Sequence, residues 1–153
     1  MSGVNKIKVL VTGANGFVGR NLCAVLARRD DVLLYHHDVE QTQVELEAAL
    51  AEADVIYHLA GVNRPLDPAD FAKGNADFTR QICDRLLALK RAPLIVLSSS
   101  TQAELDNPYG ASKRQAEQIV ADYAQTCAAA SPVSPLRLCV SALKPPYARI
   151  YRL

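Results

Sequence analysis

Short apolar runs alternate with amphipathic stretches along most of the chain. Short runs rich in β-branched residues are typical of strands buried on both faces, and these are predicted over residues 8–11, 32–35, 54–59 and 94–97. Apolar residues recurring at helical spacing predict helices over residues 17–29, 44–51, 75–90 and 109–127. Strands that alternate with helices predict an α/β fold, built on a doubly wound parallel sheet.

This alternation ends near residue 130. Residues 128–135 are small and include two prolines, which is typical of a connection rather than a helix. Residues 136–140, or alternatively residues 150–153, have the composition of one further strand. We therefore expect a folded domain over residues 1–130 and a divergent tail over residues 131–153.

Composition narrows the class of protein. The chain has 153 residues, of which 50% are hydrophobic and 22% charged, as in globular proteins of one domain. Its net charge is only +1, so no overall field attracts nucleic acid or an anionic membrane. No apolar run is long enough to span a bilayer, and none resembles a signal peptide. Four scattered cysteines without CxxC or histidine at ligand spacing favour reduced thiols in a cytoplasmic protein without a metal site.

A glycine-rich turn follows the first predicted strand and opens the first predicted helix. Gly13, Gly16 and Gly19 form the spacing GxxGxxG. Glycines allow a tight turn and a close backbone approach, and the helix N-terminus offers unpaired N–H groups to a diphosphate. In this position between strand and helix, the motif predicts a Rossmann-type dinucleotide-binding fold.

The residues alone leave the dinucleotide open between NAD and NADP. Asp38 lies 19 positions after Gly19, near the spacing at which an acidic residue accepts the ribose hydroxyls of NAD. Arg20, His36 and His37 instead offer positive or hydrogen-bonding groups to the 2′-phosphate of NADP.

Two further motifs carry groups suited to proton transfer. Tyr109 and Lys113 are four residues apart on a predicted helix and so share one face. A nearby ammonium favours the phenolate form of tyrosine, which suits the phenol to exchange a proton with a hydroxyl or carbonyl. Residues 98–101, with the sequence SSST, follow the fourth predicted strand, at the edge where α/β sheets bind ligands.

Together these motifs resemble one known family. The stretches VTGANGFVGRNL, ADVIYHLAG, LSSS and PYGASK are similar, in order and spacing, to the extended short-chain dehydrogenase/reductases, or NAD-dependent epimerase/dehydratase family, that act on nucleotide sugars. Within that family, HLAGVNRP and SSSTQAELDNPYGASK most resemble the bacterial capsular polysaccharide reductases that make UDP-N-acetyl-L-fucosamine.

The resemblance implies roles for individual residues. It implies a catalytic set of Ser100, Tyr109 and Lys113. It implies cofactor contacts from Gly13, Gly16, Phe17, Val18, Gly19, Leu59, Ala60, Gly61, Asn75 and Lys113, in addition to the candidates Arg20 and Asp38. It implies substrate contacts from Asn63 and Arg64. Two other residues are expected to be structural: His58 as a packed core histidine and Tyr123 as an aromatic on a helix surface.

The resemblance also implies a reaction, namely reduction of a 4-keto UDP-sugar in surface polysaccharide synthesis. It favours NADP(H), with NAD as the other choice, and it implies a nucleotide sugar as substrate while leaving homodimerisation open. A UDP-sugar 4-epimerase and a non-catalytic NAD(P)-binding module or inactive fragment are the alternatives. The residues from 131 onward depart from the family pattern. We therefore expect a truncated member, with a fold incomplete at the C-terminus, weak or absent NADP(H) binding and poor turnover.

Overall fold

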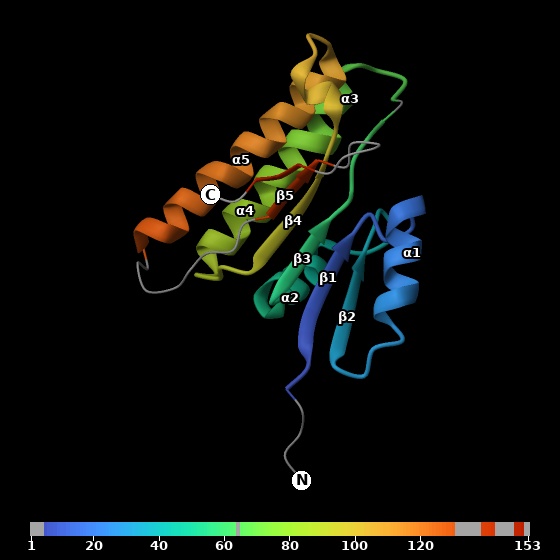
Figure 1. The fold of residues 1–153 in the computed structure, drawn as a ribbon, viewed down its shortest axis with the longest axis vertical. Helices are drawn as coiled ribbons and strands as arrows, with labels where there is room; N and C mark the ends of the chain where they lie inside the picture. Colours follow the sequence, from blue (N-terminus) through green and yellow to red (C-terminus); the bar gives the residue numbers. More distant parts are fainter. Residues whose placement is uncertain (1–4, 64, 131–138, 143–148, 152–153) are drawn as a thin grey trace.

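One sheet forms the centre of the molecule (Figure 1). The computed structural model describes residues 5–63, 65–130, 139–142 and 149–151. The strands are β1 (Ile7–Thr12), β2 (Val32–His37), β3 (Val55–His58), β4 (Leu94–Ser99), β5 (Cys139–Ala142) and β6 (Arg149–Tyr151). Their order in the sheet is β2-β1-β3-β4-β5-β6, and every neighbouring pair is parallel except β5 with β6.

Helices cover both faces of this sheet. They are α1 (Phe17–Leu26), α2 (Gln43–Glu52), α4 (Phe78–Ala88) and α5 (Pro108–Ala130). Leu10, Ile56 and Ile95 from three neighbouring strands are buried in one core with α2, α4 and α5. Val9 and Val11 point the other way and pack against α1. Figure 1 shows α1 at one side of the molecule and α4 with α5 at the other. The predicted doubly wound parallel sheet is confirmed.

The direction of winding changes between β1 and β3. From β1 the chain first moves outward to β2 and then returns to place β3 on the other side of β1. Thr12 is in register with His37 of β2 and with His58 of β3, so the three strands end level. Ligands of open α/β sheets bind at the carboxyl ends of the strands on either side of such a reversal.

The helical region before β4 differs from the expected single helix over residues 75–90. It begins earlier, as α3 (Ala69–Phe71), and continues through a π-helical segment η1 (Ala72–Asp77) into α4. A π-turn holds one more residue than an α-turn, so it shifts the apolar periodicity from which a helix start is predicted. A short 3-10 helix η2 (Thr101–Glu104) after β4 was also not predicted.

Two local predictions on α5, for Asn107 and for Tyr123, have different outcomes. Asn107 caps α5 as predicted, because its Oδ1 accepts a hydrogen bond from the Gly110 N–H at 2.7 Å. The expected position of Tyr123 on a helix surface is wrong. Its side chain is only 2% exposed, and its hydroxyl donates to the Arg91 carbonyl at 2.8 Å. The ring continues the buried stripe of α5 that packs against α4, and burial raises the pKa of the phenol.

The tail contributes to the sheet where it is described. Of the stretch 136–140 predicted as a strand, residues 136–138 lie outside the described residues, and residues 139 and 140 belong to β5. Within the alternative stretch 150–153, residues 150 and 151 belong to β6. The predicted domain boundary at residue 130 coincides with the last residue of α5 and stays a prediction.

Candidate active site

A cleft of about 600 Å³ lies at the carboxyl edge of the sheet. Its walls come from the turn after β1, the end of β2, the segment after β3, η1 with the start of α4, the end of β4 and the first turns of α5. The predicted site residues that line it are Gly13, Gly16, Phe17, Val18, Gly19, Asp38, Leu59, Ala60, Gly61, Asn63, Tyr109 and Lys113. Arg20, Asn75 and Ser100 do not line it, and Arg64 lies outside the described residues.

The glycine turn is shaped by close backbone contacts. Gly13 has φ +70°, and a Cβ there would lie 2.6 Å from the Ala60 nitrogen. A Cβ on Gly19 would overlap the Gly13 carbonyl oxygen. Gly16 is the N-cap of α1 and provides no capping side chain, so the first N–H groups of the helix keep no side-chain partner from the cap. A turn with glycines at its close contacts, followed by a helix N-terminus without a capping side chain, can hold a diphosphate.

Asp38 supplies a carboxylate at one end of the cleft. One of its oxygens accepts a hydrogen bond from the Asn15 N–H in the glycine turn at 2.8 Å, and the other accepts from the Val39 N–H at 2.9 Å. The Asp38 N–H donates to Gln41 Oε1 at 2.7 Å, which fixes the backbone. The carboxylate is therefore held in place and keeps lone pairs free to accept hydroxyl groups.

The groups expected to offer positive charge there are arranged differently. Arg20 is exposed, and its Nε donates to the Asn15 carbonyl at 2.6 Å from outside the cleft. His37 lines the cleft, but burial lowers the pKa of its imidazole. His36 is exposed on the same strand. Among the described residues lining this end, Asp38 is thus the charged group.

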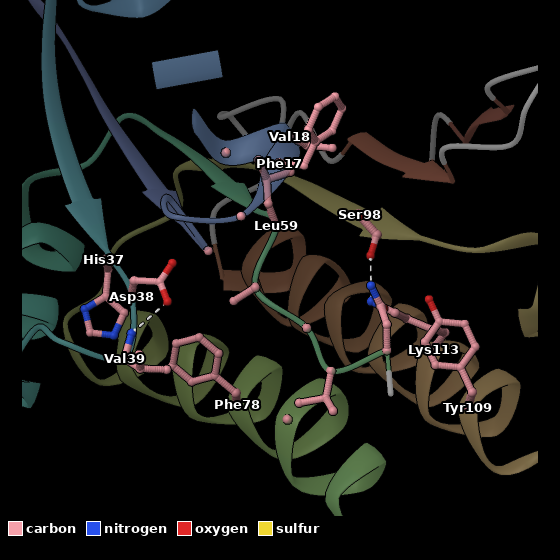
Figure 2. Close-up of a pocket in the computed structure, with 18 residues that line it drawn as sticks. Phe17, Val18, His37, Asp38, Val39, Leu59, Phe78, Ser98, Tyr109 and Lys113 are labelled. Atoms are coloured by element: carbon pink, nitrogen blue, oxygen red, sulfur yellow. Dashed lines mark hydrogen bonds between the residues drawn. The ribbon is translucent and has the colours of Figure 1, made fainter. Parts of the chain in front are cut away.

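Lys113 and Tyr109 occupy the other end of the cleft, as Figure 2 shows. Lys113 is only 6% exposed, and its Nζ donates to the Ser98 carbonyl at 3.3 Å. The same Nζ lies 5.8 Å from the centre of the Tyr109 ring. Burial lowers the pKa of the Lys113 ammonium, and the nearby Glu117 carboxylate acts in the opposite direction. A phenol and a buried amine thus face one space.

The three serines after β4 take different positions. Ser98 lines the cleft, whereas the Ser99 hydroxyl donates to Glu117 of α5. Ser100 is the N-cap of η2, and its Oγ accepts from the Gln102 N–H at 3.2 Å. Ser98 is therefore the serine beside Lys113, while the catalytic role expected for Ser100 stays a prediction.

Asn75 acts from behind the cleft wall. It is 2% exposed, its Oδ1 accepts from the Val62 N–H at 2.9 Å, and its Nδ2 donates to the Val62 carbonyl at 3.1 Å and to Ser112 Oγ at 3.0 Å. A Cβ on Gly61 would lie 2.7 Å from Asn75 Oδ1 and 2.9 Å from Lys113 Nζ. Only a glycine lets Asn75 and Lys113 approach the wall so closely.

Sequence reasoning missed several residues of the cleft. It did not name Val39, Val62, Gly74 or Phe78. It named His37 only as a possible contact of the 2′-phosphate of NADP, and Ser98 only within residues 98–101. Val39, Val62 and Gly74 each adjoin a predicted site residue, so widening each motif by one position finds them but not Phe78. The three consecutive serines carried no signal to separate Ser98 from Ser100. The apolar pattern of the predicted helix over residues 75–90 places Phe78 in the core.

Comparison with known proteins places this geometry in a family. The family model described as "NAD dependent epimerase/dehydratase family" matches residues 9–140. The chain belongs to this family. Its members use a nicotinamide dinucleotide, and the glycine turn fits the diphosphate of such a group, because Gly13, Gly16 and Gly19 border the cleft without side chains.

Two curated relatives differ in their similarity. The chain is 48% identical over 112 residues to a UDP-2-acetamido-2,6-beta-L-arabino-hexul-4-ose reductase of Pseudomonas aeruginosa, a match that covers 73% of this chain and 30% of the reductase. It is 29% identical over 130 residues to a ceramide reductase of Caulobacter vibrioides, covering 73% of this chain and 41% of that protein. The chain therefore spans less than half the length of either relative.

Solved structures share the fold. The capsular polysaccharide assembling protein CapF of Staphylococcus aureus superposes with a TM-score of 0.70 at 40% identity, over 86% of this chain and 34% of CapF. The UDP-glucuronic acid 4-epimerase of Bacillus cereus, solved with NAD, superposes with a TM-score of 0.66 at 20% identity, over 77% of this chain and 52% of the epimerase. The second similarity shows the fold alone.

The described part of the chain has neither a membrane-spanning helix nor a metal-ligand cluster. No helix there is both long and apolar enough to cross a bilayer. No group of three or more metal-ligating side chains occurs among the described residues. Cys23, Cys83 and Cys127 are free thiols.

Proposed function

We propose that this chain is the dinucleotide-binding part of a nucleotide-sugar reductase, which reduces a 4-keto UDP-sugar in bacterial surface polysaccharide synthesis. The observation that carries the proposal is that one cleft has the Asp38 carboxylate at one end and the Tyr109–Lys113 pair at the other. The 48% identity to a reductase of a UDP-linked hexulose supports the substrate class. The similarity to a capsular polysaccharide assembling protein supports the setting.

In this proposal the cleft holds NAD(P)(H) along its length. The glycine turn and the N-terminus of α1 would hold the diphosphate, Asp38 and Val39 would border the adenosine, and Lys113 would lie beside the nicotinamide ribose, since all of these line the cleft. When bound, the dinucleotide would supply a hydride for the carbonyl carbon of the sugar.

Side chains of the protein then supply the proton and stabilise the charge that its transfer leaves. Reduction of the keto group leaves negative charge on its oxygen, and Tyr109 donates its phenolic proton to that oxygen. The Lys113 ammonium stabilises the negative charge that this transfer leaves on the phenol, because it lies beside the ring. Asn63 borders the same cleft and is proposed to contact the substrate, together with Arg64. Ser100 is proposed to orient the substrate carbonyl.

The proposed dinucleotide is NADP(H), which the family resemblance favours. Arg20 adds no support to this choice, because it does not line the cleft and donates to the Asn15 carbonyl from outside it. Asp38 opposes it, because a carboxylate beside the adenosine ribose repels a 2′-phosphate. Parallel titrations with NADPH and NADH decide between them.

A dinucleotide-binding module without turnover is the second candidate. The chain matches only 30% of the length of the similar reductase, and this partial match is the observation that favours the module. The cytoplasm is the proposed location, where the free thiols Cys23, Cys83 and Cys127 stay reduced.

One experiment separates these candidates. The purified chain is titrated with NADPH and with NADH by fluorescence, with and without a 4-keto UDP-sugar, alongside Tyr109→Phe. Binding with oxidation of the dinucleotide, lost in Tyr109→Phe, supports the reductase. Binding without oxidation supports the module. Absence of binding to either dinucleotide overturns both candidates.

A further inference from the structure

His58 is a buried polar group that the proposed reaction does not use. It ends β3, is 1% exposed, and lies directly before the segment of residues 59–62 that lines the cleft. Its Nδ1 lies 2.6 Å from the Thr12 hydroxyl at the end of β1. Its Nε2 lies 2.9 Å from the Thr79 hydroxyl in the second residue of α4.

The neighbouring hydrogen bonds determine which nitrogen carries the proton. The Thr79 hydroxyl donates its single hydrogen to the Asn75 carbonyl at 2.6 Å. It is therefore left to accept from His58, so Nε2 must be protonated. Nδ1 of the neutral ring is then an acceptor, and the Thr12 hydroxyl donates to it. The Thr12 oxygen in turn accepts from the Ala60 N–H at 3.3 Å.

This gives one continuous chain of hydrogen bonds with a single direction at each link. It begins at the Ala60 N–H and ends at the Asn75 carbonyl, which belongs to the π-helical segment η1. The Asn75 side chain continues it, because its amide binds both the N–H and the carbonyl of Val62. The wall of residues 59–62 is thus held near both ends by groups that meet through His58.

The surroundings of His58 also favour the neutral form of its ring. Burial and the nearby Lys113 ammonium lower the pKa of His58 to about 3. A second ring proton, on Nδ1, would face the Thr12 hydroxyl, which could accept it only by giving up its own donation to the ring. The edge of the ring also packs against Phe78, with ring centres 5.4 Å apart.

We propose that His58 is a positioning residue, a neutral imidazole protonated on Nε2 that joins Thr12 to Thr79 and thereby fixes the cleft wall of residues 59–62 against Asn75. The effect on cofactor affinity rests on the proposed function, because that wall is where the dinucleotide would lie. The effect on the wall itself does not depend on it.

The first test uses nuclear magnetic resonance of the whole chain labelled with ¹⁵N. The proposal requires that the His58 ring shows the Nε2–H tautomer and keeps it from pH 8 to pH 5. A ring protonated on Nδ1, or one that titrates within this range, overturns the proposal.

The second test uses three variants. Thr79→Val keeps the shape of the side chain and removes the hydroxyl, Thr79→Ser restores the hydroxyl, and Thr126→Val is the matched control. Thr126 also donates to the carbonyl four residues earlier, that of Asp122, but on the exposed side of α5. Loss of the buried acceptor is expected to shift the amide resonances of Ala60 and Val62 and to weaken NADPH or NADH binding about 10-fold.

The outcomes are distinct. Thr79→Ser is expected to regain wild-type resonances and affinity within about 2-fold, and Thr126→Val to keep them. Unchanged Ala60 and Val62 resonances in folded Thr79→Val overturn the proposal. If the wild-type chain binds no dinucleotide, the proposed function fails while these resonances still decide the role of His58. If it binds and Thr79→Val binds equally well, the link to affinity is wrong.

Discussion

The Lys113 ammonium donates a hydrogen bond to the main-chain carbonyl of Ser98 across 3.3 Å, and this contact joins α5 to the end of β4. The amine is nearly buried, and burial lowers its pKa. A buried cation with one neutral acceptor contributes little to the stability of the fold, because its desolvation offsets the hydrogen bond. Lys113 is therefore expected to contribute more to ligand binding than to the stability of the fold.

Replacement of this lysine is therefore expected to separate stability from binding. Lys113→Met keeps the length of the side chain and removes the buried charge, so the melting temperature is expected to stay the same or rise. Dinucleotide affinity is expected to fall about 10-fold, the usual loss when a hydrogen bond to a charged group is removed. Calorimetry and fluorescence titration measure the two effects.

Lys73→Met is the matched control for this prediction. Lys73 is largely exposed and pairs with Asp70 at 3.4 Å on the helical region before α4. Its replacement is expected to change neither quantity. A large fall in melting temperature for Lys113→Met would contradict this prediction, because it would mean that the ammonium stabilises the fold.

Asp38 leads to a prediction about selectivity between the two dinucleotides. Its carboxylate is fixed by the Asn15 N–H at the end of the cleft away from Tyr109. Asp38→Asn removes the negative charge while keeping the shape, so NADPH affinity is expected to rise relative to NADH affinity by about 10-fold. Asp30→Asn, at an exposed carboxylate outside the cleft, is the control. An unchanged ratio would place the ribose away from Asp38.

Much of the fold could be predicted because its signals are local. The strand at 94–97 and the helix after Asn107 follow from apolar runs and from a capping residue, and both are found. The π-helical segment around Asn75 could not be predicted, since its reason is tertiary. The Asn75 amide binds the backbone of Val62 in another segment, and no periodicity in residues 72–77 records that contact.

The candidate site also contains both residues that could be predicted from the sequence and residues that could not. Gly13 and Gly19 could be predicted to form a turn because their spacing reflects the backbone approach itself. The serine beside Lys113 could not be chosen, because side chains alternate along β4 and the end of that strand was not fixed by the sequence pattern. In the structure β4 ends at Ser99, Ser98 lines the cleft, and Ser100 caps η2.

Gly13 is expected to be the less tolerant of two glycines in the turn. It has φ +70°, and a Cβ would meet the Ala60 backbone at 2.6 Å, so Gly13→Ala is expected to reduce the free energy of unfolding by about 1–3 kcal/mol. Gly16→Ala is the matched control, because its Cβ would approach only the Gly13 carbonyl oxygen, at 3.3 Å. Urea unfolding compares the two. Equal losses would contradict the positive φ and the close approach as the cause.

The buried imidazole of His58 predicts how stability changes with pH. Its pKa falls on folding from 6.5 to about 3, so the unfolded chain takes up a proton below pH 6.5 that the folded chain refuses. The contribution of His58 to stability is therefore complete above pH 6.5 and is lost progressively as the pH falls toward 3. Between pH 7 and pH 5 this loss is expected to be about 2 kcal/mol.

A variant isolates this contribution from the other titrating groups. His58→Gln keeps an acceptor for Thr12 and a donor for Thr79 but takes up no proton. It is expected to have a lower free energy of unfolding at pH 7 than the wild-type chain, and to lose about 2 kcal/mol less between pH 7 and pH 5. His37, whose pKa burial also lowers, contributes equally to both chains and cancels. His36→Gln, at an exposed histidine of β2, is expected to keep the wild-type pH dependence. If His58→Gln also keeps the wild-type pH dependence, the His58 ring takes up a proton in the folded chain at pH 5. That outcome would contradict the neutral ring inferred from the directions of its hydrogen bonds.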